Sequence, residues 1–168
     1  MPTHYKGSAE TVRALNAHIN LARATDSLFA RLSPQLEQDG LTTGQFGVLE
    51  ALLHLGPMCQ HALGQKLLRS GGNVTLVVDN LEKRGWVRRE RLESDRRMIM
   101  IHLTSAGRDL IGKVFPKHAR AVTKEMSRLN AAEQETLRRL TRKLGLGGET
   151  SRRERRKKEK QHDSNSTQ

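Results

Sequence analysis

The chain has 168 residues, the size of one ordinary domain, and this length excludes a large multidomain enzyme. Its 30 Lys and Arg residues outnumber its 18 Asp and Glu residues, and the net charge of +12 favours a polyanionic partner. Aromatic residues make up only 3% of the chain, too few for the stacking platforms that bind single-stranded nucleic acid. DNA, RNA and an anionic membrane surface remain as candidate partners, with single-strand binding disfavoured.

The sequence predicts a cytoplasmic protein that is not embedded in a membrane. No run approaches the roughly 18 consecutive apolar residues of a membrane span. Residues 1–30 lack the apolar block and cleavage site of a secretory signal. The single cysteine, Cys59, cannot close a disulfide within the chain or supply a CxxC pair, so burial of apolar side chains must stabilise the fold.

Helical periodicity begins near the amino terminus. Apolar side chains at three- and four-residue steps predict a first helix across residues 12–36, which ends before Asp39-Gly40. Thr42 and Gln45 have the spacing of a capping box, so a second helix should begin there. Gly56-Pro57 should end it.

Two further helices are expected before residue 85. A short third helix should run from Cys59 to Leu68. A fourth helix follows the glycines at 71 and 72, and Gly85 should close it in the left-handed conformation. Its inner face should consist of apolar residues at helical spacing, namely Val74, Val77, Val78 and Leu81.

The pattern then changes to that of strands. Residues 86–91 and 97–103 predict two short strands joined by a turn at 92–95, which together make a β-hairpin. Short helix, turn, helix and hairpin in this order are typical of a winged helix-turn-helix. The expected fold class is therefore mainly α with a small β-hairpin wing (α+β).

Helical signals return after the hairpin. Thr104-Ser105 can cap a fifth helix, which Pro116 should bend. Asn130 and Glu133 have the spacing of another N-terminal cap, and the sixth helix that they open should end at the glycine-rich residues 145–148. These helices would flank the winged lobe on its carboxyl side.

Polar and small residues gather at the start of the fourth helix. Two short helices joined by a tight turn present the second one to the major groove of B-DNA, which at about 12 Å admits a helix. Ser70, Asn73 and Thr75 fall in its first turn and a half, and Gly72 lets the backbone approach phosphate closely. The alternative for Asn73 and Thr75 is ordinary helix capping and surface exposure.

The segment 71–107 resembles the recognition helix and wing of MarR-family transcriptional regulators. The most specific parts of the resemblance are the VDNLEKRG segment at 78–85, the DRR at 95–97 and the LTSAG at 103–107. The pattern extends over roughly residues 10–145. Leu76 departs from it, because many relatives carry a polar or basic side chain there, and this leaves less hydrogen-bonded base recognition to the helix. Contact with a thymine methyl group is the alternative for this side chain.

The resemblance implies a homodimer that binds a palindromic double-stranded DNA operator and represses transcription. It divides the chain into an N-terminal dimerisation helix (1–38), the winged helix-turn-helix DNA-binding lobe (39–104) and C-terminal dimerisation helices (105–148). The composition of residues 149–168 separately predicts a basic disordered tail, which either adds nonspecific phosphate affinity or is a solvated segment with no specific role. The resemblance implies that the DNA-binding residues are Ser70, Gly72, Asn73, Thr75, Arg91, Arg96 and Arg97.

The arginines of the wing have a physical reason to approach DNA. Arg97, with Arg96, should enter or border a narrow minor groove, where the negative potential is enhanced. Asp95 should orient an arginine rather than contact DNA, because phosphate would repel its carboxylate. The alternative is a solvated turn with a surface ion pair worth about 0–1 kcal/mol.

Family members commonly release DNA in response to a small aromatic (often phenolic) ligand, an oxidant or a metal. Cys59, at the expected start of the third helix, is a candidate redox-active thiol, although a structural role is favoured. The histidines lack metal-ligand spacing, so no metal site and no cofactor are expected. A ligand pocket bordered by His18, Phe46 and Trp86 is an open alternative to core positions for these side chains.

The sequence does not favour an enzyme, since the GxxxxGK[ST], GxSxG and HExxH motifs are absent. The main rival hypothesis is a basic adaptor that binds nucleic acid or a membrane surface without sequence specificity. The basic tail alone would suit such an adaptor. Preference among duplex sequences distinguishes the two hypotheses.

Overall fold

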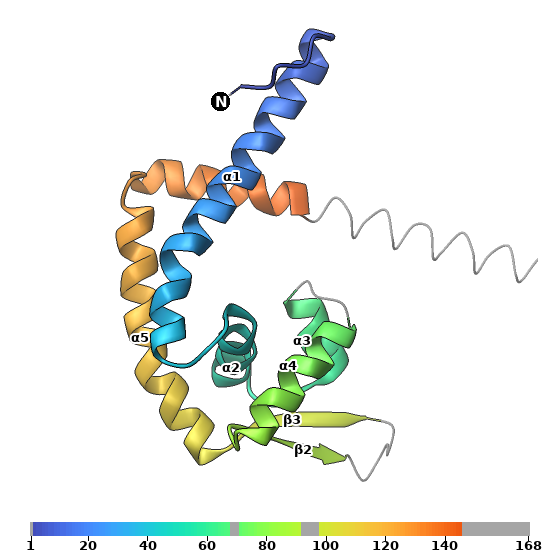
Figure 1. Ribbon diagram of the computed structural model, residues 1–168, viewed down its shortest axis with the longest axis vertical. Helices are drawn as coiled ribbons and strands as arrows, with labels where there is room; N and C mark the ends of the chain where they lie inside the picture. The colour runs from blue at the N-terminus through green and yellow to red at the C-terminus, as the bar shows by residue number, and fades with distance from the viewer. Residues whose placement is uncertain (1, 68–70, 92–97, 146–168) are drawn as a thin grey trace, which may run out of the picture. The chain divides into compact units, whose positions relative to one another are not determined.

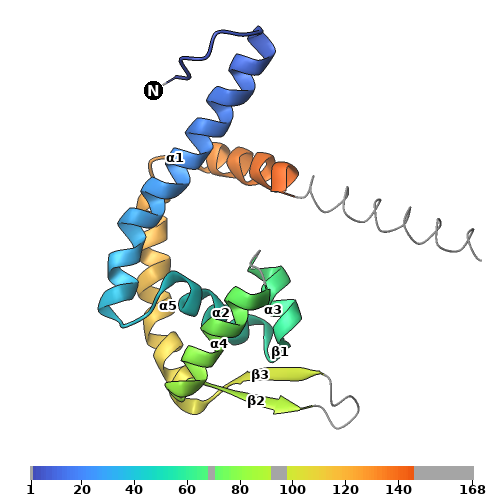
Figure 2. The same cartoon turned by 45° about the vertical axis from the view of Figure 1, so that its right-hand side comes forward.

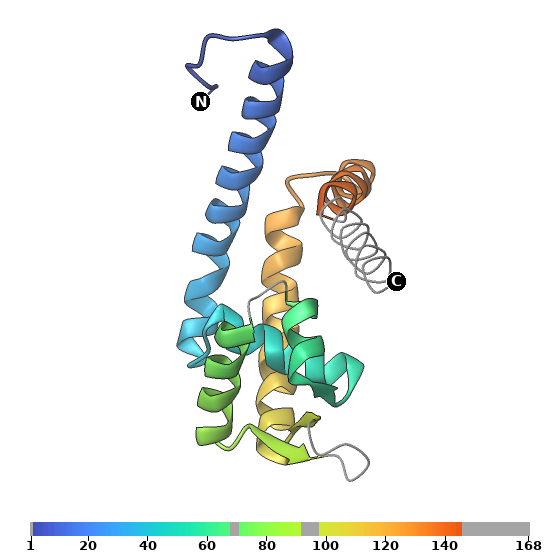
Figure 3. The same cartoon turned by 90° about the vertical axis from the view of Figure 1, so that its right-hand side faces the viewer.

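A computed structural model describes residues 2–67, 71–91 and 98–145 (Figure 1). The chain divides into two compact units, Met1–Thr123 and Lys124–Gln168. Within the first unit, a lobe of helices and strands follows the long α1 helix (Ala9–Gln38), and the N-terminal half of α1 extends beyond that lobe (Figure 3). None of the helices in the described residues is long and apolar enough to cross a membrane.

The boundaries of the first two helices confirm the capping signals. The chain leaves α1 through Gly40, which has a φ of 73°, so the predicted end at Asp39-Gly40 is confirmed. Helix α2 (Thr43–Leu55) begins with the predicted capping box, in which the Gln45 amide donates to the Thr42 hydroxyl at 3.2 Å and the Thr42 amide donates to the Gln45 side chain at 3.0 Å.

The expected third helix is shorter than the sequence indicated, and its start was wrong. Residues Met58–Cys59 form a short strand, β1, and helix α3 runs only over Gln60–Lys66. Strand β1 pairs antiparallel with a later strand, with Met58 opposite Ile101. A strand of two residues is too short to show the alternation by which strands are found in a sequence.

Helix α4 (Gly71–Lys83) leads into the hairpin of β2 (Val87–Arg91) and β3 (Ile99–Leu103) (Figures 1 and 2). The predicted left-handed residue Gly85 has a φ of 71°, a conformation that favours glycine. With β1 the hairpin makes a three-stranded antiparallel sheet in the order β1-β3-β2, so the sheet has one more strand than the predicted hairpin.

Helix α5 (Ser105–Met126) begins as the sequence predicts and continues through Pro116. The Thr104 hydroxyl caps it by accepting from the Gly107 amide at 3.0 Å. A Cβ atom at Gly107 would lie 1.9 Å from the Trp86 carbonyl oxygen, so only glycine allows this close approach to the hairpin.

The second unit contains a further helix at residues 131–145. Its predicted cap is confirmed, because the Glu133 amide donates to the Asn130 side chain at 3.0 Å and the Asn130 amide donates to the Glu133 carboxylate at 2.8 Å. Three leucines of this helix are exposed, namely Leu137, Leu140 and Leu144.

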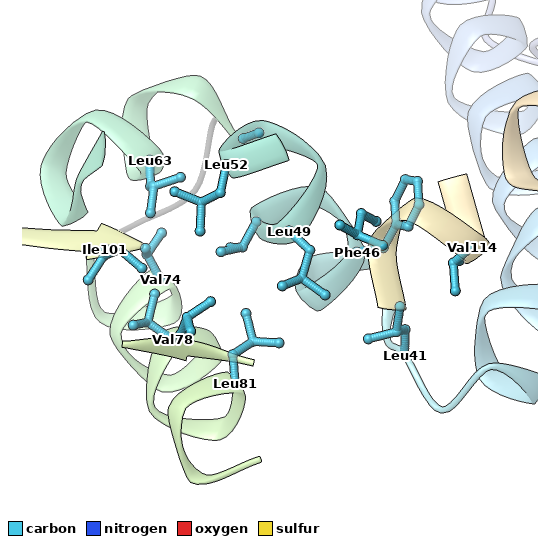
Figure 4. Packing of buried hydrophobic residues seen from close by; sticks show 14 of the residues in the cluster. Leu41, Phe46, Leu49, Leu52, Leu63, Val74, Val78, Leu81, Ile101 and Val114 are labelled. Carbon is cyan, nitrogen blue, oxygen red and sulfur yellow. The ribbon is translucent and has the colours of Figure 1, made fainter. Parts of the chain in front are cut away.

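The core of the lobe lies between α2, α3, α4 and the sheet (Figure 4). Burying a leucine, isoleucine or valine side chain stabilises a fold by about 1.5–3 kcal/mol. The side chains that meet there include Leu49 and Leu52 of α2, Leu63 of α3, Val74, Val78 and Leu81 of α4, and Ile101 of β3. This packing fixes which face of α4 points inward.

A histidine lies where α5 packs on α2. The rings of His118 and Phe46 have centroids 4.4 Å apart, and the His118 Nδ1 atom is buried without a hydrogen-bond partner among the described residues. Burial lowers the pKa of His118 from its ordinary value of 6.5, against the opposing effect of the Glu50 charge. The native protein therefore favours the neutral ring.

Two leucines of α4 make a matched pair for testing this core. Leu81 is fully buried, whereas 62% of the Leu76 surface is exposed. We expect Leu81→Ala to lower the free energy of unfolding by about 2–5 kcal/mol, because it removes buried methyl groups and leaves a cavity. We expect Leu76→Ala to change it by less than about 0.5 kcal/mol. Urea denaturation measures both, and equal effects would contradict the orientation of α4.

The pKa of His118 predicts a pH dependence of stability. Below about pH 6.5 the unfolded chain takes up a proton that the native ring resists, so stability should fall as the pH drops toward the lowered native pKa. His118→Phe should make the decline between pH 7 and pH 5 shallower. Thermal unfolding over this range measures it, and an unchanged or steeper decline would contradict the neutral buried ring.

Candidate nucleic-acid interface

The outer face of α4 consists of four exposed residues. They stand at steps of three, four and three residues, the spacing of one helix face, and are Asn73, Leu76, Asn80 and Lys83. We name this set the α4 outer face. It exists because Val74, Val78 and Leu81 on the opposite side are buried in the core. A helix presented in this way has the dimensions to enter a major groove.

The carboxylates of α4 are bound within the lobe. The Arg89 guanidinium, from β2, forms an ion pair with Asp79 at 2.5 Å and a second ion pair with Glu82. The Arg89 amide also donates to the Glu82 carboxylate at 3.0 Å. We name Arg89, Asp79 and Glu82 the α4–β2 clamp. It holds the strand against the helix and balances two charges that would otherwise repel phosphate.

The clamp further stabilises the charged form of its arginine. Burial alone would lower the pKa of Arg89, but the hydrogen bonds and negative charges of Asp79 and Glu82 raise it above its ordinary value. This role of Arg89 was not predicted from the sequence. Two signals were available: Asp79 and Glu82 stand three residues apart on one helix, and strand alternation turns Arg89 to the same side as the buried Val87.

The other face of the hairpin carries a separate ion pair. Arg88 and Glu90 are paired with each other and exposed, and the His102 Nε2 atom lies 3.4 Å from the same Glu90 carboxylate. The hydrogen bond from Arg88 is the main reason that the pKa of Glu90 is lowered. Arg91 is exposed at the end of β2, where the described part of the strand stops.

The predicted DNA-binding residues of α4 have different environments. Asn73 is exposed on the α4 outer face, as predicted. Thr75 is half-buried, and its hydroxyl accepts a hydrogen bond from the Gln60 side chain of α3. Gly72 lies in the first turn of α4. Four further predicted residues lie outside the described residues, namely Ser70, Asp95, Arg96 and Arg97.

Sequence reasoning overlooked Asn80 and Lys83 as members of the same face as Asn73. The helical period of the buried valines would have located them, because a fixed inner stripe fixes the outer one. Arg84, next in sequence, serves the fold: it donates to the Gly40 carbonyl at 2.7 Å, and its guanidinium lies 3.7 Å from the centre of the Trp86 ring.

The residues named as a possible ligand pocket lie in separate environments. His18 is exposed on α1, Phe46 is buried against His118, and Trp86 lies under the Arg84 guanidinium. Cys59 is half-buried in β1 and precedes α3 without capping it through its side chain. Packing accounts for Phe46, Trp86 and Cys59, whereas His18 is exposed to solvent.

The clamp predicts a contrast between adjacent arginines. Arg89→Met should lower the free energy of unfolding by about 1 kcal/mol, because it leaves Asp79 and Glu82 without their cation and water screens them only in part. Arg88→Met, in the exposed pair, should have no measurable effect on stability. Urea denaturation of both variants measures the contrast. Equal stability of the two variants would show that the clamp does not hold the hairpin.

Comparison with known proteins agrees with this geometry. The family model described as the MarR family matches residues 41–99. The Bacillus subtilis protein YkoM, an uncharacterized HTH-type transcriptional regulator, is 35% identical over 137 residues, which cover 82% of this chain and 89% of YkoM.

Two solved structures are similar over most of their length. One is Sco3205 from Streptomyces coelicolor, a MarR family transcriptional regulator in complex with DNA, with a TM-score of 0.75, 26% identity and coverage of 88% of this chain and 92% of that one. The other is Bordetella bronchiseptica BpsR, whose DNA binding is regulated by 6-hydroxynicotinic acid, with a TM-score of 0.72, 25% identity and coverage of 86% and 98%. The chain therefore belongs to the MarR family and is a DNA-binding transcriptional regulator of the winged helix-turn-helix type.

Proposed function

We propose that the protein is a homodimeric repressor that binds a palindromic DNA operator. The observation that carries this proposal is the α4 outer face, which is exposed, largely polar and free of acidic residues, with Lys83 at its end. In this arrangement α4 enters the major groove. Backbone amides at its N-terminus, near Gly72, approach phosphate, and Asn73 reaches a base edge.

The hairpin supplies the second contact. Arg91 is exposed at the end of β2, and beyond it the proposal places Arg96 and Arg97 in or beside the adjacent minor groove. Asp95 orients one of these arginines, and Ser70 completes the approach to phosphate at the start of α4. The Thr75 hydroxyl accepts a hydrogen bond from the Gln60 side chain, so Thr75 contributes by holding α3 against α4.

The flanking helices carry the dimer in this proposal. Residues 1–38 and 105–148 are the dimerisation segments, 39–104 the DNA-binding lobe and 149–168 a basic tail that adds nonspecific phosphate affinity. The exposed side chains of Leu137, Leu140 and Leu144 in the helix at 131–145 are spaced by three and four residues and support a helix-packing surface. An uncovered apolar stripe of this kind favours association.

The signal that releases the operator is proposed to be a small aromatic ligand. The support is BpsR, whose DNA binding is regulated by such a compound. A ligand acts in this way only if it binds the DNA-free arrangement of the dimer more tightly than the DNA-bound one. The position of the half-buried Cys59 supports a packing role over oxidative sensing.

Selection of bound duplexes from a random pool tests the proposal. We expect the selected duplex to be palindromic and to bind one dimer. Its affinity should exceed that of random duplex by a factor of at least about 10³ at physiological salt, because base contacts add to phosphate attraction. Equal binding to every duplex would contradict the proposal and favour the nonspecific basic adaptor. A stable monomer on the winning duplex would contradict the dimer.

A further inference from the structure

The most unusual residue of the α4 outer face is a leucine. Leu76 has 62% of its surface exposed, whereas Val74, Val78 and Leu81 of the same helix are buried. Its neighbours one turn away on the outer face are Asn73 and Asn80, both exposed. An apolar side chain therefore stands alone in the middle of a polar face.

This isolation argues against a contact with another helix. Packing between helices needs apolar residues repeated at three- and four-residue steps, as Leu137, Leu140 and Leu144 are in the helix at 131–145. On α4 the corresponding positions hold Asn73 and Asn80, with Lys83 one turn further on. A helix face with amide groups and a cation around one apolar side chain is suited to bind a polyanion that presents an apolar group at one point.

Duplex DNA is a polyanion that presents such an apolar group in its major groove. The edges of guanine, adenine and cytosine present hydrogen-bond donors and acceptors there, whereas thymine adds the C5 methyl group. A leucine side chain has no donor or acceptor, so it would leave a polar base edge without a partner and favours the methyl group instead. Resting on the proposed function, we infer that Leu76 is a specificity-determining residue that recognises a thymine C5 methyl group.

Replacing thymine by uracil removes only that methyl group and tests the inference. In the duplex won by selection, each thymine is replaced by uracil in turn, symmetrically in both half-sites. We expect one position at which uracil weakens binding about 4-fold per half-site, the equivalent of about 0.8 kcal/mol for one buried carbon. In a second duplex the thymine at this position is replaced by cytosine. Restoring the methyl group, by using 5-methylcytosine in place of that cytosine, should raise the affinity by a similar factor.

Variants assign the effect to the side chain. Leu76→Ala should bind the thymine and uracil duplexes equally at that position, and the exposure of Leu76 means that the variant should remain folded. Asn73→Ala is the matched control on the same face: it should weaken binding overall but keep the 4-fold ratio. The ratio within one variant cancels any general loss of affinity.

Two results would overturn the inference while leaving the proposed function intact. One is a selected duplex in which no thymine-to-uracil change weakens binding by the wild-type protein. The other is a Leu76→Ala variant that discriminates thymine from uracil as strongly as the wild type does. Failure to select any preferred duplex would instead overturn the proposed function, so the two failures are distinguishable.

Discussion

The burial of three side chains of α4 is the constraint on which the rest of the molecule depends. Val74, Val78 and Leu81 insert among the leucines of α2 and α3 and Ile101 of β3 (Figure 4). Because a helix that buries one stripe must expose the opposite one, this packing alone selects the residues that α4 presents to a partner. The proposed DNA-binding surface is therefore a consequence of the core.

Polar contacts extend this constraint from the helix to the elements around it. Arg89 joins β2 to the two carboxylates of α4, and Arg84 joins the end of α4 to the turn between α1 and α2. In the same turn, Asp39 forms an ion pair with Lys117 of α5 at 3.0 Å. Direct contacts therefore join α5, through this turn, to the lobe that contains α4.

Local chemistry made much of the fold predictable from the sequence. The capping boxes at Thr42 and Asn130 and the left-handed Gly85 each depend on residues within a few positions of one another, so their patterns are visible along the chain. Strand β1 was not predicted, because its two residues form a strand only by pairing with β3, more than forty positions away. The same applies to the candidate site: the exposure of Asn73 was predictable from the helix period, whereas the hydrogen bond from Gln60 to Thr75 and the clamp at Arg89 arise only when separate elements pack together.

The most direct test of the central claim is a crystal structure of the protein bound to its selected duplex. The α4 outer face should lie in the major groove in each half-site, with the Leu76 side chain against a thymine methyl group and the valine stripe still buried in the lobe. A complex in which α4 faces solvent and the duplex is held by other elements would contradict the claim.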